Sequence, residues 1–158
     1  MPSQSPTLLI LAGKRDGKLD PLAERAGVSH KAVVPIRGKP LISWVLEAAE
    51  QAWPDNRILV SIHDGGVIEG LTIVERLTAA DRLQITEARA GIVESLEAAV
   101  ETGAPWPLLI TTGDNVLVTP ETLRRLHNEA MAAGAGAALS LATREQILAA
   151  HPEGQRRF

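Results

Sequence analysis

The chain of 158 residues has no cysteine and no tyrosine, and aromatic residues make up only 3% of it. Without cysteine, the protein has no disulfides, no thiolate zinc site and no cysteine nucleophile, which fits a reducing compartment. With so few aromatic rings, the core must be built from Leu, Val, Ile and Ala, within an apolar fraction of 45%. A chain of this length and composition is expected to form one domain with a real core.

Long hydrophobic runs are also missing. The first residues, MPSQSPT, lack the basic start of a signal peptide, and the longest later run of small apolar residues, AAGAGAALSLA, is too short to span a bilayer. We therefore expect a soluble, cytoplasmic protein that has no membrane partner.

Positive charge is scarce overall but concentrated near the N-terminus. The formal net charge is −3, which argues against a broad basic surface for nucleic acid. Up to Lys39 there are seven cations against three acids, a net charge of +4, so the remainder carries −7. This asymmetry predicts either a local anion site near the N-terminus or solvated loops that happen to collect Lys and Arg.

Short apolar runs alternate with amphipathic stretches along the chain. Continuous apolar runs bounded by Gly, Pro or polar residues predict five strands, over residues 7–12, 57–62, 83–87, 107–112 and 136–142. Helical spacing predicts helices over residues 40–53, 67–77, 91–102 and 119–134. Thr119 is expected to cap its helix and Gly103 to end the preceding one in a left-handed conformation.

This alternation predicts an α/β fold, a three-layer α/β/α sandwich around a mostly parallel, Rossmann-like sheet. Ligands of such sheets bind beyond the carboxyl ends of the strands. The loop after the first strand and the sequence Gly113-Asp114-Asn115 after the fourth both begin at that edge. Two polar segments far apart in the sequence are therefore expected to share one crevice.

The loop GKRDGK follows the first strand directly. Gly13 and Gly17 allow positive φ and a close approach of backbone N–H groups to a ligand, while Lys14, Arg15 and Lys18 supply positive charge. This combination suits a polyphosphate. The loop is not a Walker motif, because it is one residue short of GxxxxGK and lacks the following Ser or Thr. A solvated loop is the alternative reading.

Asp114 is the carboxylate that follows the fourth strand. Mg²⁺ takes one or two protein carboxylates and fills its other positions with water and phosphate oxygens, so one aspartate opposite a phosphate loop is enough to begin a metal site. The alternative is a structural Asx-turn within the Gly-Asp-Asn sequence. The four histidines, His30, His63, His127 and His151, show no ligand spacing and are predicted to lie on the surface or in loops.

Four segments resemble, in order and spacing, the nucleotidyltransferases of the MobA-like NTP transferase family. They are LILAGKRDGK, SHKAVVPIRGKPLISWVLEA, EARAGIVESLEAAV and PLLITTGDNVLVTPETL. The resemblance implies a fold of the nucleotide-diphospho-sugar transferase type and one NTP transferase domain over residues 1–158, incomplete at its C-terminus. It implies transfer of an NMP from an NTP to a small phosphorylated acceptor, with Mg²⁺ bound and pyrophosphate released.

The resemblance also assigns roles to individual residues. Those that line the nucleotide would be Leu11, Ala12, Gly13, Lys14, Gly91 and Ser95, of which the last two border the base. The catalytic residues would be Arg15 and Lys31, which contact phosphates, and Asp114, which binds Mg²⁺. Lys39 is expected to support the packing of the Gly-Lys-Pro turn rather than to touch a substrate.

Two functions of other classes remain open at this point. The chain could be a nucleotide-binding α/β module without turnover, which would respond to NTP but release no pyrophosphate. It could instead be a flavodoxin-like binding domain in which Asp114 belongs to a simple turn, and then neither NTP nor Mg²⁺ would affect it.

Overall fold

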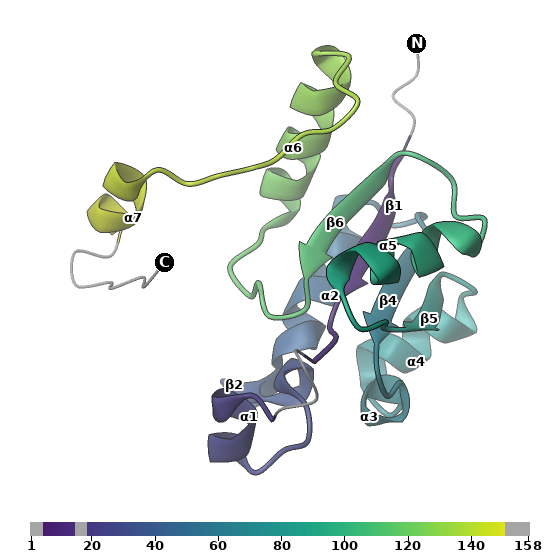
Figure 1. Ribbon diagram of the computed structural model, residues 1–158, viewed down its shortest axis with the longest axis vertical. Coiled ribbons are helices and arrows are strands. Elements are labelled where there is room, and N and C mark those ends of the chain that lie inside the picture. Colours follow the sequence, from purple (N-terminus) through teal and green to yellow (C-terminus); the bar gives the residue numbers. More distant parts are fainter. Residues whose placement is uncertain (1–4, 15–18, 151–158) are drawn as a thin grey trace.

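Four strands pair side by side in one parallel sheet at the centre of the computed structural model (Figure 1). In chain order they are β1 (Thr7–Leu11), β4 (Ile58–Ile62), β5 (Leu83–Glu87) and β6 (Leu108–Thr112). The order across the sheet is β5-β4-β1-β6, so β1 has a neighbour on each side. The structure describes residues 5–14 and 19–150, and every element named here lies within them.

The side chains of the inner strands alternate between two cores, one on each face of the sheet. Leu8 and Ile10 of β1 pack on one face with α2 (Leu41–Ala52) and α4 (Thr72–Ala79). Leu9 points to the other face and packs under α5 (Ile92–Glu101). Figure 1 shows α5 in front of the sheet, with α2 and α4 behind it. Helices on both faces confirm the predicted three-layer sandwich.

The segment that leads into α2 is a small hairpin. Strands β2 (Pro35–Ile36) and β3 (Lys39–Pro40) pair antiparallel, and both residues of the turn, Arg37 and Gly38, have positive φ. Glycine takes this conformation freely, which explains the Gly-Lys-Pro sequence. The helix predicted over residues 40–53 forms as α2, and the side chains that it buries include Leu41, Ile42, Val45, Leu46 and Ala49.

Two predicted helix ends are found as expected. The side chain of Thr119 accepts a hydrogen bond from the backbone N–H of Thr122, with N and Oγ1 3.2 Å apart, at the start of α6 (Pro120–Ala132). Gly103, just after α5, has φ of 72°. Both features follow from the capping preferences of these residues.

The single helix predicted over residues 67–77 is wrong, because the chain forms two helices there. α3 (Gly66–Glu69) is followed by its C-cap residue Gly70, and α4 begins at Thr72. Glycine loses more conformational entropy in a helix than other residues do, which favours a break at this position.

The fifth predicted strand, over residues 136–142, is also wrong, since no strand forms in this segment. Its larger side chains, Leu139 and Leu141, are 79% and 78% exposed, and the segment leads to α7 (Arg144–Ala150), which lies apart from the sheet in Figure 1. The preceding Gly and Ala residues are poor strand formers. Within the described residues, no helix is both long and apolar enough to cross a membrane.

The buried core and the exposed segment 136–142 can be compared by replacing one leucine of each with alanine. Leu46→Ala removes a fully buried side chain of the larger core, so we expect the free energy of unfolding to fall by about 2–5 kcal/mol. Leu139→Ala should change it by no more than about 0.5 kcal/mol. Urea denaturation of both variants measures this difference. A loss at Leu139 comparable to that at Leu46 would show that residues 136–142 pack into the fold.

Candidate functional site

The ends of β1 and β6 lie against each other at the carboxyl edge of the sheet. The backbone N–H of Gly113, just after β6, donates to the carbonyl oxygen of Leu11 at an N–O distance of 2.8 Å. A Cβ on Gly113 would lie 3.1 Å from the Cβ of Ala12. The close contact is possible because both residues are small, and it places the Asp114 turn directly beside the start of the loop after β1.

Lys31 and Asp114 form an ion pair at this edge. Lys31 Nζ lies 2.6 Å from Asp114 Oδ2, although the two residues are 83 positions apart in the sequence. Lys31 begins the short 3-10 helix η1 (Lys31–Val33), which packs against α2, and Asp114 follows β6. Both side chains are partly exposed, so a ligand can reach them.

A second carboxylate lies near the same ammonium group. Asp20 Oδ2 is 3.9 Å from Lys31 Nζ, while the other oxygen of Asp20 caps α1 (Pro21–Ala26) by accepting from the backbone N–H of Leu22. The sequence reasoning did not place Asp20 in the site. The available signal was an Asp-Pro pair at a helix start, which predicts a cap but not what the second oxygen faces.

The carboxyl group of Asp114 stays ionised more readily than that of a free aspartate. Partial burial raises its pKa, but hydrogen bonds from Lys31 and Thr112 and the charge of Lys31 outweigh this effect, so the net pKa is lowered. In an Asx-turn, the N–H of Val116 would donate to the side chain of Asp114. Here it donates to the backbone carbonyl oxygen of Asp114 instead, which argues against the Asx-turn alternative.

The loop after β1 is fixed at its start by His63. The backbone N–H of Lys14 donates to Nδ1 of His63 at 2.9 Å. A Cβ on Gly13 would lie 3.1 Å from both the Cε1 of His63 and the Cβ of Ala88, so a larger residue here would have to displace these neighbours slightly. His63 directly follows β4, and the rule that ligands gather at strand carboxyl ends could have singled it out. The predicted phosphate contact Arg15 lies outside the described residues.

Gly91 and Ser95 lie at the start of α5, where Gly91 is the N-cap residue. The hydroxyl of Ser95 accepts from the N–H of Arg89 at 2.9 Å and donates to the carbonyl oxygen of Gly91 at 2.8 Å. Ser95 is only 5% exposed. Its hydroxyl therefore holds the loop that precedes α5, and the role of both residues at the base of a nucleotide stays a prediction.

One histidine differs from the prediction of surface or loop positions: His127 lies within α6 and is 4% exposed. His30 lies in a loop, as predicted, but is also only 4% exposed. His127 packs edge-on against Trp53, with ring centroids 5.6 Å apart. Burial lowers the pKa of His30, as do the nearby Lys14 and His63, while Asp64 opposes them. His151 lies outside the described residues.

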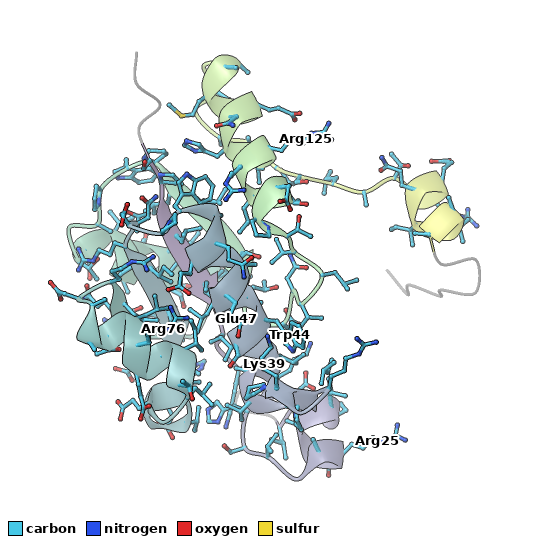
Figure 2. All side chains as sticks on the ribbon, turned by 180° about the vertical axis from the view of Figure 1, so that it is seen from behind. Arg25, Lys39, Trp44, Glu47, Arg76 and Arg125 are labelled. Atoms are coloured by element: carbon cyan, nitrogen blue, oxygen red, sulfur yellow. The ribbon has the colours of Figure 1, made fainter. Side chains whose placement is uncertain are left out.

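Lys39 supports the hairpin, as expected, rather than reaching Lys31 or Asp114. Its Nζ lies 2.6 Å from Glu47 Oε2 and 3.4 Å from the centroid of the Trp44 ring. Figure 2 shows Lys39, Trp44 and Glu47 together along α2. Lys39 is therefore a suitable control for Lys31, because it is a lysine in an ion pair that lies outside the site.

The four-stranded parallel sheet with helices on both faces is an α/β domain of the nucleotide-diphospho-sugar transferase type, the fold that similar solved structures share. The profile of the MobA-like NTP transferase domain matches residues 8–156, and the chain belongs to this family. The match leaves the flavodoxin-like alternative without support.

Curated relatives are larger than this chain. The bifunctional protein GlmU of Geobacter metallireducens is 36% identical over 106 residues, which cover 66% of this chain and 22% of GlmU. GlmU of Dechloromonas aromatica is 32% identical over 96 residues, which cover 61% of this chain and 21% of the relative. The matches thus span about a fifth of the length of these curated relatives.

Solved structures show the same fold. A hypothetical transferase from Thermus thermophilus superimposes with a TM-score of 0.67 and is 28% identical, over 98% of this chain and 58% of that one. A CMP:2-keto-3-deoxy-manno-octonic acid synthetase complexed with CTP gives a TM-score of 0.58 at 19% identity, over 84% and 49% of the two chains. At this identity the second likeness shows the fold alone.

The ion pair can be tested through the titration of Asp114. We expect the Asp114 carboxyl to titrate below the ordinary range in the wild-type protein and to move upward in Lys31→Met, where burial remains but the ammonium group is gone. Because the pKa of Asp114 is lower in the folded than in the unfolded state, its carboxylate contributes stability at pH values above the unfolded-state pKa. This contribution is lost as the pH falls through the folded-state pKa. NMR of the carboxyl carbon measures the midpoints. Lys39→Met is the matched control and should leave Asp114 unchanged; an equal shift in both variants would contradict the assignment.

Proposed function

We propose that the chain is a nucleotidyltransferase domain that binds an NTP between the loop after β1 and Asp114. It would transfer the NMP to a small phosphorylated acceptor and release pyrophosphate, in the cytoplasm. The observation that supports this most is the 2.6 Å contact between Lys31 and Asp114, which follows Gly113, the residue that contacts Ala12. An ammonium group that we propose binds phosphates and a carboxylate that we propose binds a metal ion thus meet at the sheet edge where ligands of this fold class bind.

Lys31 would exchange partners when the nucleotide binds. Without a ligand, its ammonium group rests on Asp114 and near Asp20. A triphosphate brings several negative charges to the same place and competes for the ammonium group, while a divalent cation competes for the carboxylate. The ion pair is partly exposed, so breaking it costs little free energy. Lys31 would then bind the phosphates together with Arg15.

The donors in the site fit Mg²⁺ when it arrives with a triphosphate. Asp114 offers hard carboxylate oxygens, and Asp20 lies near the same ammonium group. Within the described residues, no cluster of three or more His, Cys, Asp or Glu forms a complete metal site. Mg²⁺ usually takes one or two carboxylates and completes its shell with water and substrate phosphates, so Asp114 is enough. When bound, the ion would neutralise charge that develops on the phosphate oxygens.

The reaction would need no general base. An oxygen of the acceptor phosphate is already ionised near neutral pH and can attack the α-phosphorus directly; the bond from the α-phosphorus to the bridging oxygen breaks, and pyrophosphate leaves with that oxygen. Lys31 and Arg15 would stabilise the negative charge that builds up on the departing pyrophosphate. The remaining residues that we propose line the nucleotide are Leu11, Ala12, Gly13, Lys14, Gly91 and Ser95.

Thermal unfolding with each of the four common NTPs, with and without Mg²⁺, tests binding, and a coupled pyrophosphate assay tests turnover. We expect at least one NTP to raise the melting temperature more strongly with Mg²⁺, because a ligand that binds the folded state stabilises it. With that NTP and a panel of phosphorylated acceptors, Asp114→Asn and Lys31→Met should lower the rate of pyrophosphate release by about 100-fold or more.

Lys39→Met is the control and should keep wild-type turnover, since Lys39 pairs with Glu47 outside the site. Stabilisation by NTP without pyrophosphate release in the wild type would favour the nucleotide-binding module without turnover. If no NTP shifts the melting temperature, the proposal is wrong.

A further inference from the structure

His63 holds the start of the loop after β1, which begins at Gly13 and which we call the nucleotide loop because we propose that NTP binds there. Its side chain is exposed, yet Nδ1 accepts the backbone N–H of Lys14 at 2.9 Å. The ring also packs against Gly13, where an added Cβ would come within 3.1 Å of Cε1. An exposed side chain with little packing of its own is thus in close contact with two successive residues that we propose line the nucleotide.

This contact requires one protonation state of the ring. A nitrogen that accepts a hydrogen bond has no proton, so in this contact the His63 ring is neutral and its proton is on Nε2. When an imidazole takes up a second proton, both nitrogens become donors. Nδ1 would then face the Lys14 N–H as a second donor, and the contact would be lost.

We propose that His63 is a positioning residue for the nucleotide loop, whose neutral imidazole fixes the backbone at Lys14 and thereby raises the affinity for NTP. The proposal rests on the proposed function, because it assumes that NTP binds at this loop. Its physical basis is preorganisation: a loop already held in one place loses less conformational freedom when a ligand binds. Without an acceptor at position 63, the backbone N–H of Lys14 would lose this contact, and NTP would bind more weakly.

Two substitutions at position 63 test the hydrogen bond. The Oδ1 of asparagine lies at nearly the same distance from the backbone as Nδ1 of histidine, so His63→Asn keeps an acceptor. His63→Leu removes it. Because the side chain is exposed, both variants should fold, which thermal unfolding checks. NTP dissociation constants for the three proteins are then measured by calorimetry at pH 7.5, with Mg²⁺.

At pH 7.5 we expect the leucine variant to bind NTP about fivefold more weakly than the wild type, and the asparagine variant to bind like the wild type. Equal affinity of the leucine variant and the wild type, or an asparagine variant that binds as weakly as the leucine variant, overturns the proposal.

A measurement without nucleotide distinguishes this proposal from the proposed function. Hydrogen exchange of the Lys14 amide, expressed as a protection factor, should show protection in the wild type and in His63→Asn but not in His63→Leu. If the wild type binds no NTP, the proposed function fails, and His63 as a residue that raises NTP affinity fails with it. If NTP binds but Lys14 is equally protected in all three proteins, only the role of His63 is wrong.

Discussion

The ion pair between Lys31 and Asp114 depends on the pairing of β1 with β6. The two residues are 83 positions apart, and they meet because the Gly113 N–H donates to Leu11 and brings the turn after β6 onto the end of β1. A pair this exposed adds little to stability. The ion pair therefore matters more for ligand binding than for folding, because each of its two charges can pair with an incoming ion of the opposite sign.

The order of the strands explains why the charges gather at this edge. From β1 the chain adds β4 and β5 on one side and then returns to add β6 on the other, so the loops after β1 and β6 diverge at a topological switch point. Lys31 and Asp20 reach this edge from the segment that follows β1, and Asp114 reaches it from β6. Small residues allow the approach, because a Cβ on Gly113 would lie only 3.1 Å from the Cβ of Ala12.

Much of this arrangement is readable from the sequence, because the four strands coincide with short runs between turn residues and the strand-end rule then places Asp114 at the sheet edge where β1 also ends. The strand pattern fails for residues 136–142, where an apolar run stays exposed: a strand needs an edge to pair with, and sequence patterns do not show whether one is within reach. The burial of His127 within α6 was missed because histidine is found both in cores and on surfaces. The acceptor role of His63 depends on a distance of 2.9 Å to a distant backbone atom, which no local pattern encodes.

The described part of the site is chemically simple, and this limits the kind of catalysis it can perform. Its groups are an ammonium, carboxylates and backbone N–H groups, all of which act on charge and position. Phosphoryl transfer to an ionised acceptor needs little else, because its barrier is lowered mainly by alignment and charge neutralisation. Such catalysis is sensitive to small displacements, since the charges must already be in place when the transition state forms. The close contacts of Gly13 with His63 and of Gly113 with Ala12 therefore bear on activity even though none of these four residues contributes a charge that the reaction uses.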